Sequence, residues 1–251
     1  MTQLAADKVV LVTGGASGIG RAAAVDFAAE GASHVVVADV DIVGAEATVA
    51  SLPGPGSSLE LDVTEEAAVA AAVDEVVAQH GCLDVAFNNA GVNDTPCAFH
   101  QLDAASWDRM IRINLSSVFA CMKHELRHMV DAGRGAIINT SSGAGVVAAP
   151  GLPHYTAAKH GVIGLTKAAA QEYARQGIRV NAVLPGSTDT TMLQSFIAGD
   201  EAMARIIASS NIQGRLIDPA EIASAVVWLA SDQAAMVNGQ SLVVDGGGIV
   251  R

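Results

Sequence analysis

Three side chains in the middle of the sequence could carry out proton transfer: Tyr155 and Lys159 stand four positions apart, and Ser142 precedes them. On a helix, positions i and i+4 share a face, so the phenol and the ammonium would point into the same space. A tyrosine normally loses its proton near pH 10, and a fixed neighbouring cation would lower that pKa by stabilising the phenolate. A nearby serine hydroxyl could hold a carbonyl or alcohol oxygen. The three residues predict acid–base chemistry at an oxygen bonded to carbon, although a Tyr-x-x-x-Lys pair alone is usually a surface feature.

A glycine-rich segment near the N-terminus lies between an apolar run at residues 9–12 and an alanine-rich stretch typical of a helix. Its glycines, Gly14, Gly18 and Gly20, have the spacing Gly-x-x-x-Gly-x-Gly. Glycines let a backbone approach a pyrophosphate, and a helix N-terminus supplies amide donors and a favourable dipole. The order strand, glycine turn, helix therefore predicts a dinucleotide site. An ordinary tight turn is the alternative, and the flanking elements make it the weaker one.

The next apolar run, residues 35–38, ends in Asp39. An acidic residue about 20 positions after such a glycine loop can accept hydrogen bonds from the adenosine ribose hydroxyls. The same carboxylate would repel the 2′-phosphate of NADP, and the two positions that would be basic in an NADP site are Ser17 and Val40. Asp39 therefore predicts NAD as the cofactor, whereas the alternative interpretation is that it only caps the following helix.

Further motifs follow in a fixed order. They are Asn88-Asn89-Ala90-Gly91, Asn114 in an Ile-Asn-Leu triplet, Ser142 in a serine and glycine segment, Pro185-Gly186 followed by Thr188 and Thr190, and Val243-Val244-Asp245-Gly246-Gly247. With the glycine loop and the Tyr155/Lys159 pair, their order and spacing resemble those of the short-chain dehydrogenase/reductase (SDR) family, in its compact branch of about 250 residues. The resemblance covers the whole length, and Ser142 rather than Ser141 lies at the family's spacing for the catalytic serine.

The resemblance implies an α/β fold: a Rossmann-type doubly wound parallel sheet of about seven strands, flanked by helices on both faces, in a single domain over residues 1–251. Recurring apolar runs between helical stretches agree with this alternation. We expect strands near 8–13, 34–39, 58–62, 83–88, 134–141, 178–184 and 240–245, and helices near 18–31, 41–51, 64–80, 103–131, 152–176 and 218–230. Asp218, Pro219 and Glu221 predict a capped start for the last helix.

The resemblance also assigns the cofactor contacts. The pyrophosphate region would be held by Gly14, Ser17, Gly18, Ile19 and Gly20, the adenosine ribose by Asp39, and the adenine by Asp62 and Val63. The opposite wall and the nicotinamide end would be formed by Asn89, Ala90, Gly91, Tyr155, Lys159, Pro185, Gly186, Thr188 and Thr190.

The catalytic set implied by the family is Asn114, Ser142, Tyr155 and Lys159. In the oxidative direction Tyr155 would take the alcohol proton as phenolate, a hydride would pass to the nicotinamide, and Ser142 would position the substrate oxygen and stabilise developing charge. Asn114 would interrupt helical hydrogen bonding and hold a water that relays protons through Lys159.

The substrate is expected to be a secondary alcohol or ketone, uncharged and lipophilic, cyclic, steroid-like or a dihydrodiol. Besides Ser142 and Tyr155, the expected lining is apolar, without an obvious arginine or lysine: Val92, Val146, Val147, Leu152, Leu193 and Phe196. Residues 189–213 predict short amphipathic helices that cover the substrate as a lid. An NADPH-dependent ketoreductase for 3-oxoacyl substrates and a glucose-type sugar dehydrogenase remain alternatives within the same chemistry.

Composition limits the other classes. The 251 residues are 51% hydrophobic, enough for a large core, and the formal net charge of −12 disfavours nucleic acid and anionic membranes as partners. We find no apolar stretch long enough to span a membrane and no signal peptide. The three scattered cysteines indicate reduced thiols and a cytoplasmic protein. The resemblance favours a homotetramer.

Two rival hypotheses come from outside this chemistry. His124, Glu125 and His128 match His-Glu-x-x-His, a metalloprotease zinc signature that places both imidazoles on one helix face. Because this segment already falls within the SDR pattern, we expect no metal site and attribute the histidines to a solvated or interface surface. A dinucleotide-binding regulator without turnover is the second rival, and the complete catalytic set argues against it.

Overall fold

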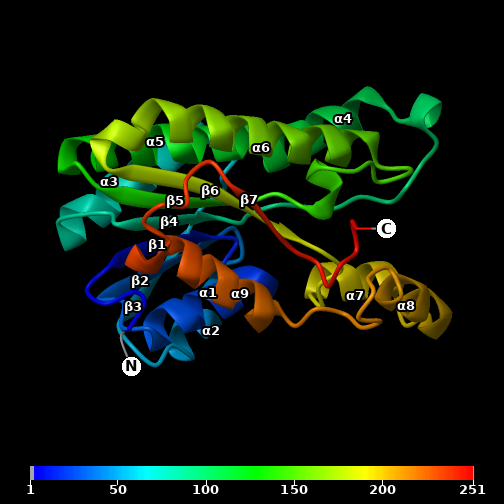
Figure 1. Cartoon of the computed structure of the whole chain (residues 1–251), viewed down its shortest axis with the longest axis horizontal. Coiled ribbons are helices and arrows are strands. Elements are labelled where there is room, and N and C mark those ends of the chain that lie inside the picture. The colour runs from blue at the N-terminus through cyan, green and yellow to red at the C-terminus, as the bar shows by residue number, and fades with distance from the viewer. Residues whose placement is uncertain (1–2, 251) are drawn as a thin grey trace.

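The apolar runs of the sequence form the strands of a parallel sheet in the computed structural model, which describes residues 3–250 except the side chain of Phe196. Within these residues the sheet has seven strands in the order β3-β2-β1-β4-β5-β6-β7, and every neighbouring pair is parallel. This confirms the doubly wound, Rossmann-type expectation (Figure 1). The strands are β1 (Val9–Thr13), β2 (His34–Asp39), β3 (Gly56–Glu60), β4 (Val85–Asn88), β5 (Gly135–Thr140), β6 (Ile178–Pro185) and β7 (Ser241–Val244).

Helices cover both faces of the sheet, as Figure 1 shows. One face packs against α1 (Gly18–Ala29), α2 (Ile42–Ala50) and α9 (Pro219–Ala230), and the other against α3 (Glu66–His80), α5 (Ser117–Ala132) and α6 (Pro153–Tyr173). Strands buried on both faces are continuous apolar runs rather than alternating ones, which is why β1 reads Val-Val-Leu-Val and is wholly buried. The expected capping box at Asp218 and Glu221 opens α9.

Two predicted elements are corrected. The strand expected at 58–62 lies at Gly56–Glu60, because it pairs with β2, which ends at Asp39 opposite Glu60. As a partly exposed edge strand containing two serines, β3 carries a weak apolar signal. The single helix expected at 103–131 is α4 (Ala104–Ile111), a π-helical turn η2 (Arg112–Ser116) and then α5.

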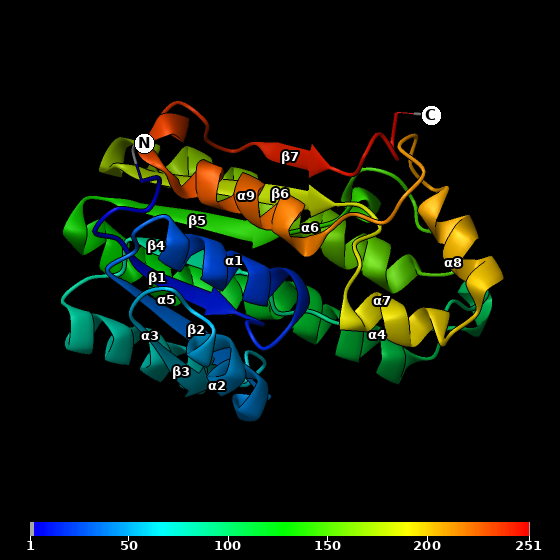
Figure 2. The ribbon, with the colours of Figure 1, turned by 90° about the horizontal axis from the view of Figure 1, so that it is seen from below.

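The carboxyl ends of the strands form the edge of the sheet at which the site is built. The strand order reverses between β1 and β4, and this switch point opens a crevice in open α/β sheets. Figure 2 shows α4, α7 (Thr191–Ile197) and α8 (Glu201–Ala208) beyond this edge. The last two helices are the short helices expected within residues 189–213.

No helix within residues 3–250 is both long and apolar enough to cross a membrane.

Candidate functional site

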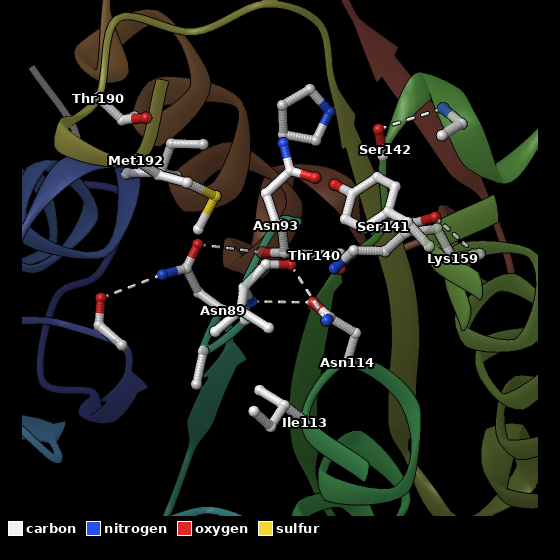
Figure 3. Close-up of a pocket in the computed structure, with 18 of the residues that line it drawn as sticks. Asn89, Asn93, Ile113, Asn114, Thr140, Ser141, Ser142, Lys159, Thr190 and Met192 are labelled. Carbon is white, nitrogen blue, oxygen red and sulfur yellow. Dashed lines mark hydrogen bonds between the residues drawn. The ribbon is translucent and has the colours of Figure 1, made fainter. Parts of the chain in front are cut away.

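A cavity of about 1220 Å³ runs along the carboxyl edge of the sheet. Its walls include the glycine loop after β1, the ends of β2 and β4, the β5–α6 segment and the start of α7. Side chains from these segments converge on one space, as the close-up in Figure 3 shows. Elements distant in sequence therefore share a single cleft.

Tyr155, Ser142 and Lys159 meet in this cavity. Tyr155 and Lys159 lie on consecutive turns of α6, and the Lys159 Nζ is 5.6 Å from the centre of the Tyr155 ring. The Ser142 hydroxyl hydrogen-bonds Tyr155 and accepts from the Ala144 amide at 3.1 Å. The neighbouring Ser141 hydroxyl donates instead to the Lys159 carbonyl at 2.8 Å, so Ser142 is the serine that faces the phenol.

The pKa of Tyr155 differs from the expectation. Burial raises it above its ordinary value, and the hydrogen bond with Ser142 offsets part of that rise. The prediction of a lowered pKa is wrong for the protein as it stands, because burial dominates, and the Lys159 ammonium, which lies over the ring, donates to the Thr140 carbonyl at 2.9 Å. Burial also lowers the pKa of Lys159 to about 8.

Asn114 interrupts its helix, as the family resemblance implied. It is buried at the centre of the π-helical turn η2. Its Oδ1 accepts from the Val92 amide and its Nδ2 donates to the Val92 carbonyl, both at 3.1 Å. π-Helical turns often occur at functional sites because they re-aim a side chain and leave backbone groups free of the helical ladder. Asn114 thereby fixes the loop after β4 beside Lys159.

The glycine loop lies against the N-terminus of α1. Gly14 and Gly18 adopt φ values of +66° and +52°, which favour glycine. Ser17 occupies the N-cap position without a capping side-chain bond and lines the cavity with Gly14, Gly18 and Ile19. Gly20 faces away from this lining: a Cβ there would come within 2.1 Å of the Gly14 carbonyl oxygen. Gly20 thus allows close packing between helix and loop.

Two carboxylates line the other end of the cavity, Asp39 as the last residue of β2 and Asp62 beyond β3. Asp39 accepts from the Ala16 amide at 2.9 Å and from the Asp41 amide at 3.0 Å, so it also shapes the glycine loop. Asp62 accepts from the backbone and hydroxyl of Thr64, which lowers the pKa of its carboxyl. Val63 lines the cavity beside it.

The remaining residues assigned to the cofactor border the middle of the cavity: Asn89, Ala90, Gly91, Pro185, Gly186, Thr188 and Thr190. The Asn89 side chain donates to the carbonyls of Thr13 and Gly14. A Cβ on Gly91 would lie 2.7 Å from the Asn114 Oδ1, so only glycine fits between them. Thr190 caps α7 by accepting from the Leu193 amide.

The substrate end agrees only in part with the expected lining. Val92, Val147 and Leu193 border the cavity, and so do Met192 and Asn93. Val146 and Leu152 are not in this lining, and the side chain of Phe196 lies outside the described part of the structure.

Other lining residues were missed from the sequence. Ile249 joins the wall because Asp245, held by the Gly247 and Ile249 amides, turns the C-terminal segment inward. The expectation of a lining without arginine is wrong, since Arg109 and Arg112 on the α4 side also border the cavity. Ile113 is a missed position that the sequence could have indicated, because it stands next to Asn114.

The zinc-like motif does not assemble a site. Glu125 is wholly buried and accepts from the Asn88 Nδ2 at 3.0 Å. The two histidines point toward α3, where His124 meets Glu66 at 3.4 Å and His128 meets Asp74 at 2.6 Å. Within residues 3–250 no cluster of three potential metal ligands occurs.

The cavity fits a nicotinamide dinucleotide. It joins a helix N-terminus, free of acidic residues in its first turn, to the carboxylate of Asp39 beside the glycine loop and to the half-buried Tyr155 and the buried Lys159. A helix N-terminus suits a pyrophosphate, and a carboxylate after the second strand suits a ribose diol.

Comparisons with known proteins agree with this geometry. A family model described as enoyl-(acyl carrier protein) reductase matches residues 14–248. The chain is 45% identical to the cis-4-hydroxycyclohexanecarboxylate dehydrogenase of Sinomonas cyclohexanicum, over 98% of both chains. It is 40% identical to the cyclohexanol dehydrogenase of Acinetobacter sp. (strain SE19), over 96% of this chain and 94% of the relative.

Among solved structures, carveol dehydrogenase from Mycobacterium avium in complex with NAD superimposes with a TM-score of 0.93 at 35% identity, covering both chains completely. Fold, site geometry and these similarities lead to one identification. The chain belongs to the short-chain dehydrogenase/reductase family and is an oxidoreductase that acts on the CH–OH group of its substrate.

Proposed function

We propose that this protein is an NAD-dependent dehydrogenase of cyclic secondary alcohols. The observation that carries the proposal is the convergence of Ser142, Tyr155 and Lys159 at one end of a cavity whose other end holds Asp39. Around the three catalytic side chains the wall contains Val92, Val147 and Leu193. Such a pocket suits an apolar carbon frame with one reacting oxygen.

The preference for NAD rests on the charge at the adenosine end. The Asp39 carboxylate borders the cavity, where it would accept from ribose hydroxyls and repel a 2′-phosphate. The adjacent Val40 is apolar and exposed, and Ser17 is uncharged. Arg21, the nearest arginine in sequence, donates to the Ala16 carbonyl and to the Thr48 hydroxyl and is thereby turned away.

The bound nicotinamide would supply hydride transfer, and the protein residues would handle the proton. Tyr155 would first lose its own proton through Lys159 and then, as phenolate, take the proton of the alcohol, while Ser142 beside it holds the same oxygen. Lys159, with a pKa of about 8, contributes positive charge near neutral pH and stabilises the phenolate once the alcohol and cofactor displace its present partner. Asn114 holds the loop at Val92 and positions a water for proton exchange with Lys159.

The ring preference is supported by the names of two relatives. One acts on a hydroxyl of a cyclohexane carboxylate and the other on cyclohexanol. The expected direction is oxidation of a ring carbinol, with the lid helices α7 and α8 closing over the ring. Leu193 borders the cavity from the first of them.

The test is a cofactor titration followed by a substrate panel. NADH and NADPH binding would be measured by fluorescence, and ring, open-chain and sugar alcohols would be screened by absorbance at 340 nm. We expect tighter NADH binding and turnover of cyclohexanols. Tighter NADPH binding would overturn the assignment of Asp39, and turnover of glucose in preference to ring alcohols would favour a sugar dehydrogenase.

The remaining proposals concern organisation. We propose a single domain over residues 1–251, a homotetramer and a cytoplasmic location. Exposed apolar side chains on α5 and α9, Phe119 and Trp228, support an assembly through these helices, and the three free thiols support a reducing compartment. Light scattering of the purified protein would test the tetramer, and a monomer would contradict it.

A further inference from the structure

A loop residue with no assigned role, Asn93, lies inside the cavity. It belongs to the segment between β4 and α4, borders the cavity and is half-buried. In Figure 3 its side chain lies between Ser142 on one side and Thr190 and Met192 on the other. The position faces the space that a substrate would occupy beyond the reacting carbon.

The backbone around Asn93 is fixed on both sides. On the preceding side, Asn114 binds both the amide and the carbonyl of Val92. On the following side, the Asp94 carboxylate meets the buried His154 ring at 3.2 Å, directly before Tyr155. The contacts of its two neighbours therefore fix the backbone of Asn93 relative to Asn114 and to the N-terminus of α6. Its side chain thus has a defined position relative to the catalytic tyrosine.

The orientation of the carboxamide is also fixed. The Asn93 Oδ1 accepts from the Asp94 amide at 2.9 Å, so this oxygen already has a hydrogen-bond partner within the loop. The Nδ2 has no hydrogen-bond partner within the described residues, so its two N–H groups remain available. Asn93 thus presents donors to the cavity beside the apolar side chains of Val92, Val147 and Leu193, while Arg109 and Arg112 border it on the α4 side. A donor in such a wall favours a ligand that carries a matching acceptor.

We propose that Asn93 is a specificity residue that donates a hydrogen bond from Nδ2 to a second oxygen on the ring of the alcohol substrate. The inference rests on the proposed function, since it assumes oxidation of a ring carbinol at Tyr155. The substrate class becomes a cyclohexanol with a hydroxyl, carbonyl or carboxylate oxygen across the ring. A ring that bears only the reacting hydroxyl would leave the Asn93 donors without a partner, at a cost in binding.

The experiment compares three substrates: cyclohexanol, cyclohexane-1,4-diol and 4-hydroxycyclohexanecarboxylate. The variants are Asn93→Ala, which removes the carboxamide, and Asn93→Asp, which keeps an acceptor for the Asp94 amide but has no donor. For the native protein we expect kcat/KM on the better of the two doubly oxygenated rings to exceed that on cyclohexanol at least tenfold. In both variants the ratio of these two kcat/KM values should fall at least about threefold, because the doubly oxygenated ring loses the donor and cyclohexanol does not use it.

The outcomes separate the two proposals. If the native protein oxidises no ring alcohol, the proposed function fails and this inference fails with it. If ring alcohols are oxidised but the variants lose activity equally on all three substrates, Asn93 serves only the loop and the inference alone is overturned. Loss of preference on the carboxylate but not on the diol, or the reverse, would support the inference and identify which oxygen Asn93 recognises.

Discussion

The two ends of the cavity are built in different ways. At the cofactor end, Asp39 ends a buried strand and Gly14 and Asn89 directly follow two others. Asp39 accepts from the Ala16 amide of the glycine loop, and the Asn89 side chain donates to the Gly14 carbonyl. At the substrate end, the walls come from the β4–α4 loop, the start of α7 and the C-terminal segment, which meet only through tertiary packing. Exposed apolar side chains remain on the lid, such as Met192 and Ile206.

This difference separates the properties that apply to every substrate, such as proton transfer and cofactor binding, from those that depend on the individual substrate. Strand ends position chemistry rigidly, so the proton-transfer and cofactor residues can be held constant while loops vary the substrate. Changes at the catalytic and cofactor residues should therefore alter turnover or cofactor preference for all substrates alike. Changes at the lid should alter kinetics to a different extent for each substrate.

The largest effect is expected for Tyr155→Phe, which removes the proton-transferring hydroxyl where the two ends meet. Turnover should fall at least about 100-fold, because general acid–base catalysis contributes that much or more. NADH binding should be nearly unchanged. The matched control is Tyr173→Phe, the other tyrosine of α6, which should keep native turnover. If Tyr155→Phe retained more than a tenth of kcat, the role of Tyr155 would be refuted.

The second prediction concerns the cofactor end alone. Asp39→Asn removes the charge but keeps an oxygen that can accept from the Ala16 amide. The ratio of kcat/KM with NADH to that with NADPH should fall about 100-fold, since two like charges a few ångströms apart repel by a few kcal/mol. Relative rates among alcohols should not change.

The control for this change is Asp41→Asn, at the neighbouring carboxylate that caps α2. It should leave cofactor preference as it is. An unaltered NADH/NADPH ratio in Asp39→Asn would mean that the preference is set elsewhere, with Arg112 the first residue to examine because it borders the same cavity.

The third prediction concerns Glu125 and how the free energy of unfolding depends on pH. Burial raises the pKa of Glu125 to about 7, and its Oε1 and the Asn88 Oδ1 have no hydrogen-bond partner among the residues that the structure describes. A proton on the Glu125 carboxyl group would make Oε1 a hydrogen-bond donor and the Asn88 Oδ1 its acceptor. The neighbouring titratable group is the buried Cys121, whose pKa burial also raises. The Asn88 that accompanies Glu125 directly precedes Asn89 of the cofactor wall.

Because the folded pKa lies above the ordinary value of 4.5, the stability contribution of Glu125 is complete below that value and is lost as the pH rises through about 7. The loss should approach about 3 kcal/mol at high pH. Glu125→Gln should remove this dependence in urea unfolding curves measured from pH 5 to 9, since its amide can donate permanently. The exposed Glu75→Gln should behave like the native protein. An equally steep decline in Glu125→Gln would exclude Glu125 as its origin.

The sequence predicted the cofactor end better than the substrate end for a physical reason. Apolar runs and glycine spacing encode local structure, so the strands β1 and β2 and the positions of Gly14 and Asp39 followed from neighbouring residues, whereas the doubly wound sheet was implied by the family resemblance. The role of Gly20 did not follow, because its contact is with a carbonyl six positions away in the chain. Nor did the raised pKa of Tyr155, which depends on burial by elements distant in sequence.

The substrate end was harder to predict from the sequence, because more of its residues are brought together by contacts between distant segments. Arg109 and Ile249 border the cavity only because α4 and the C-terminal segment fold toward it, and nothing local marks either residue. An interruption of the helix at Asn114 was implied by the family resemblance, yet the bounds of the π-helical turn could not be read from helical periodicity, because a segment of one turn is too short to show a period of its own.

The smallest effect is expected in the lid. Leu193→Ala removes apolar contact from a half-buried side chain at the cavity, so KM for ring alcohols should rise about threefold to tenfold. Because the side chain is half-exposed, the free energy of unfolding should change little. The exposed Ser195→Ala on the same helix is the matched control. If Leu193→Ala instead lowered turnover of every substrate and weakened NADH binding, α7 would belong to the cofactor end, and the division between a fixed and a variable half of the cavity would have to be redrawn.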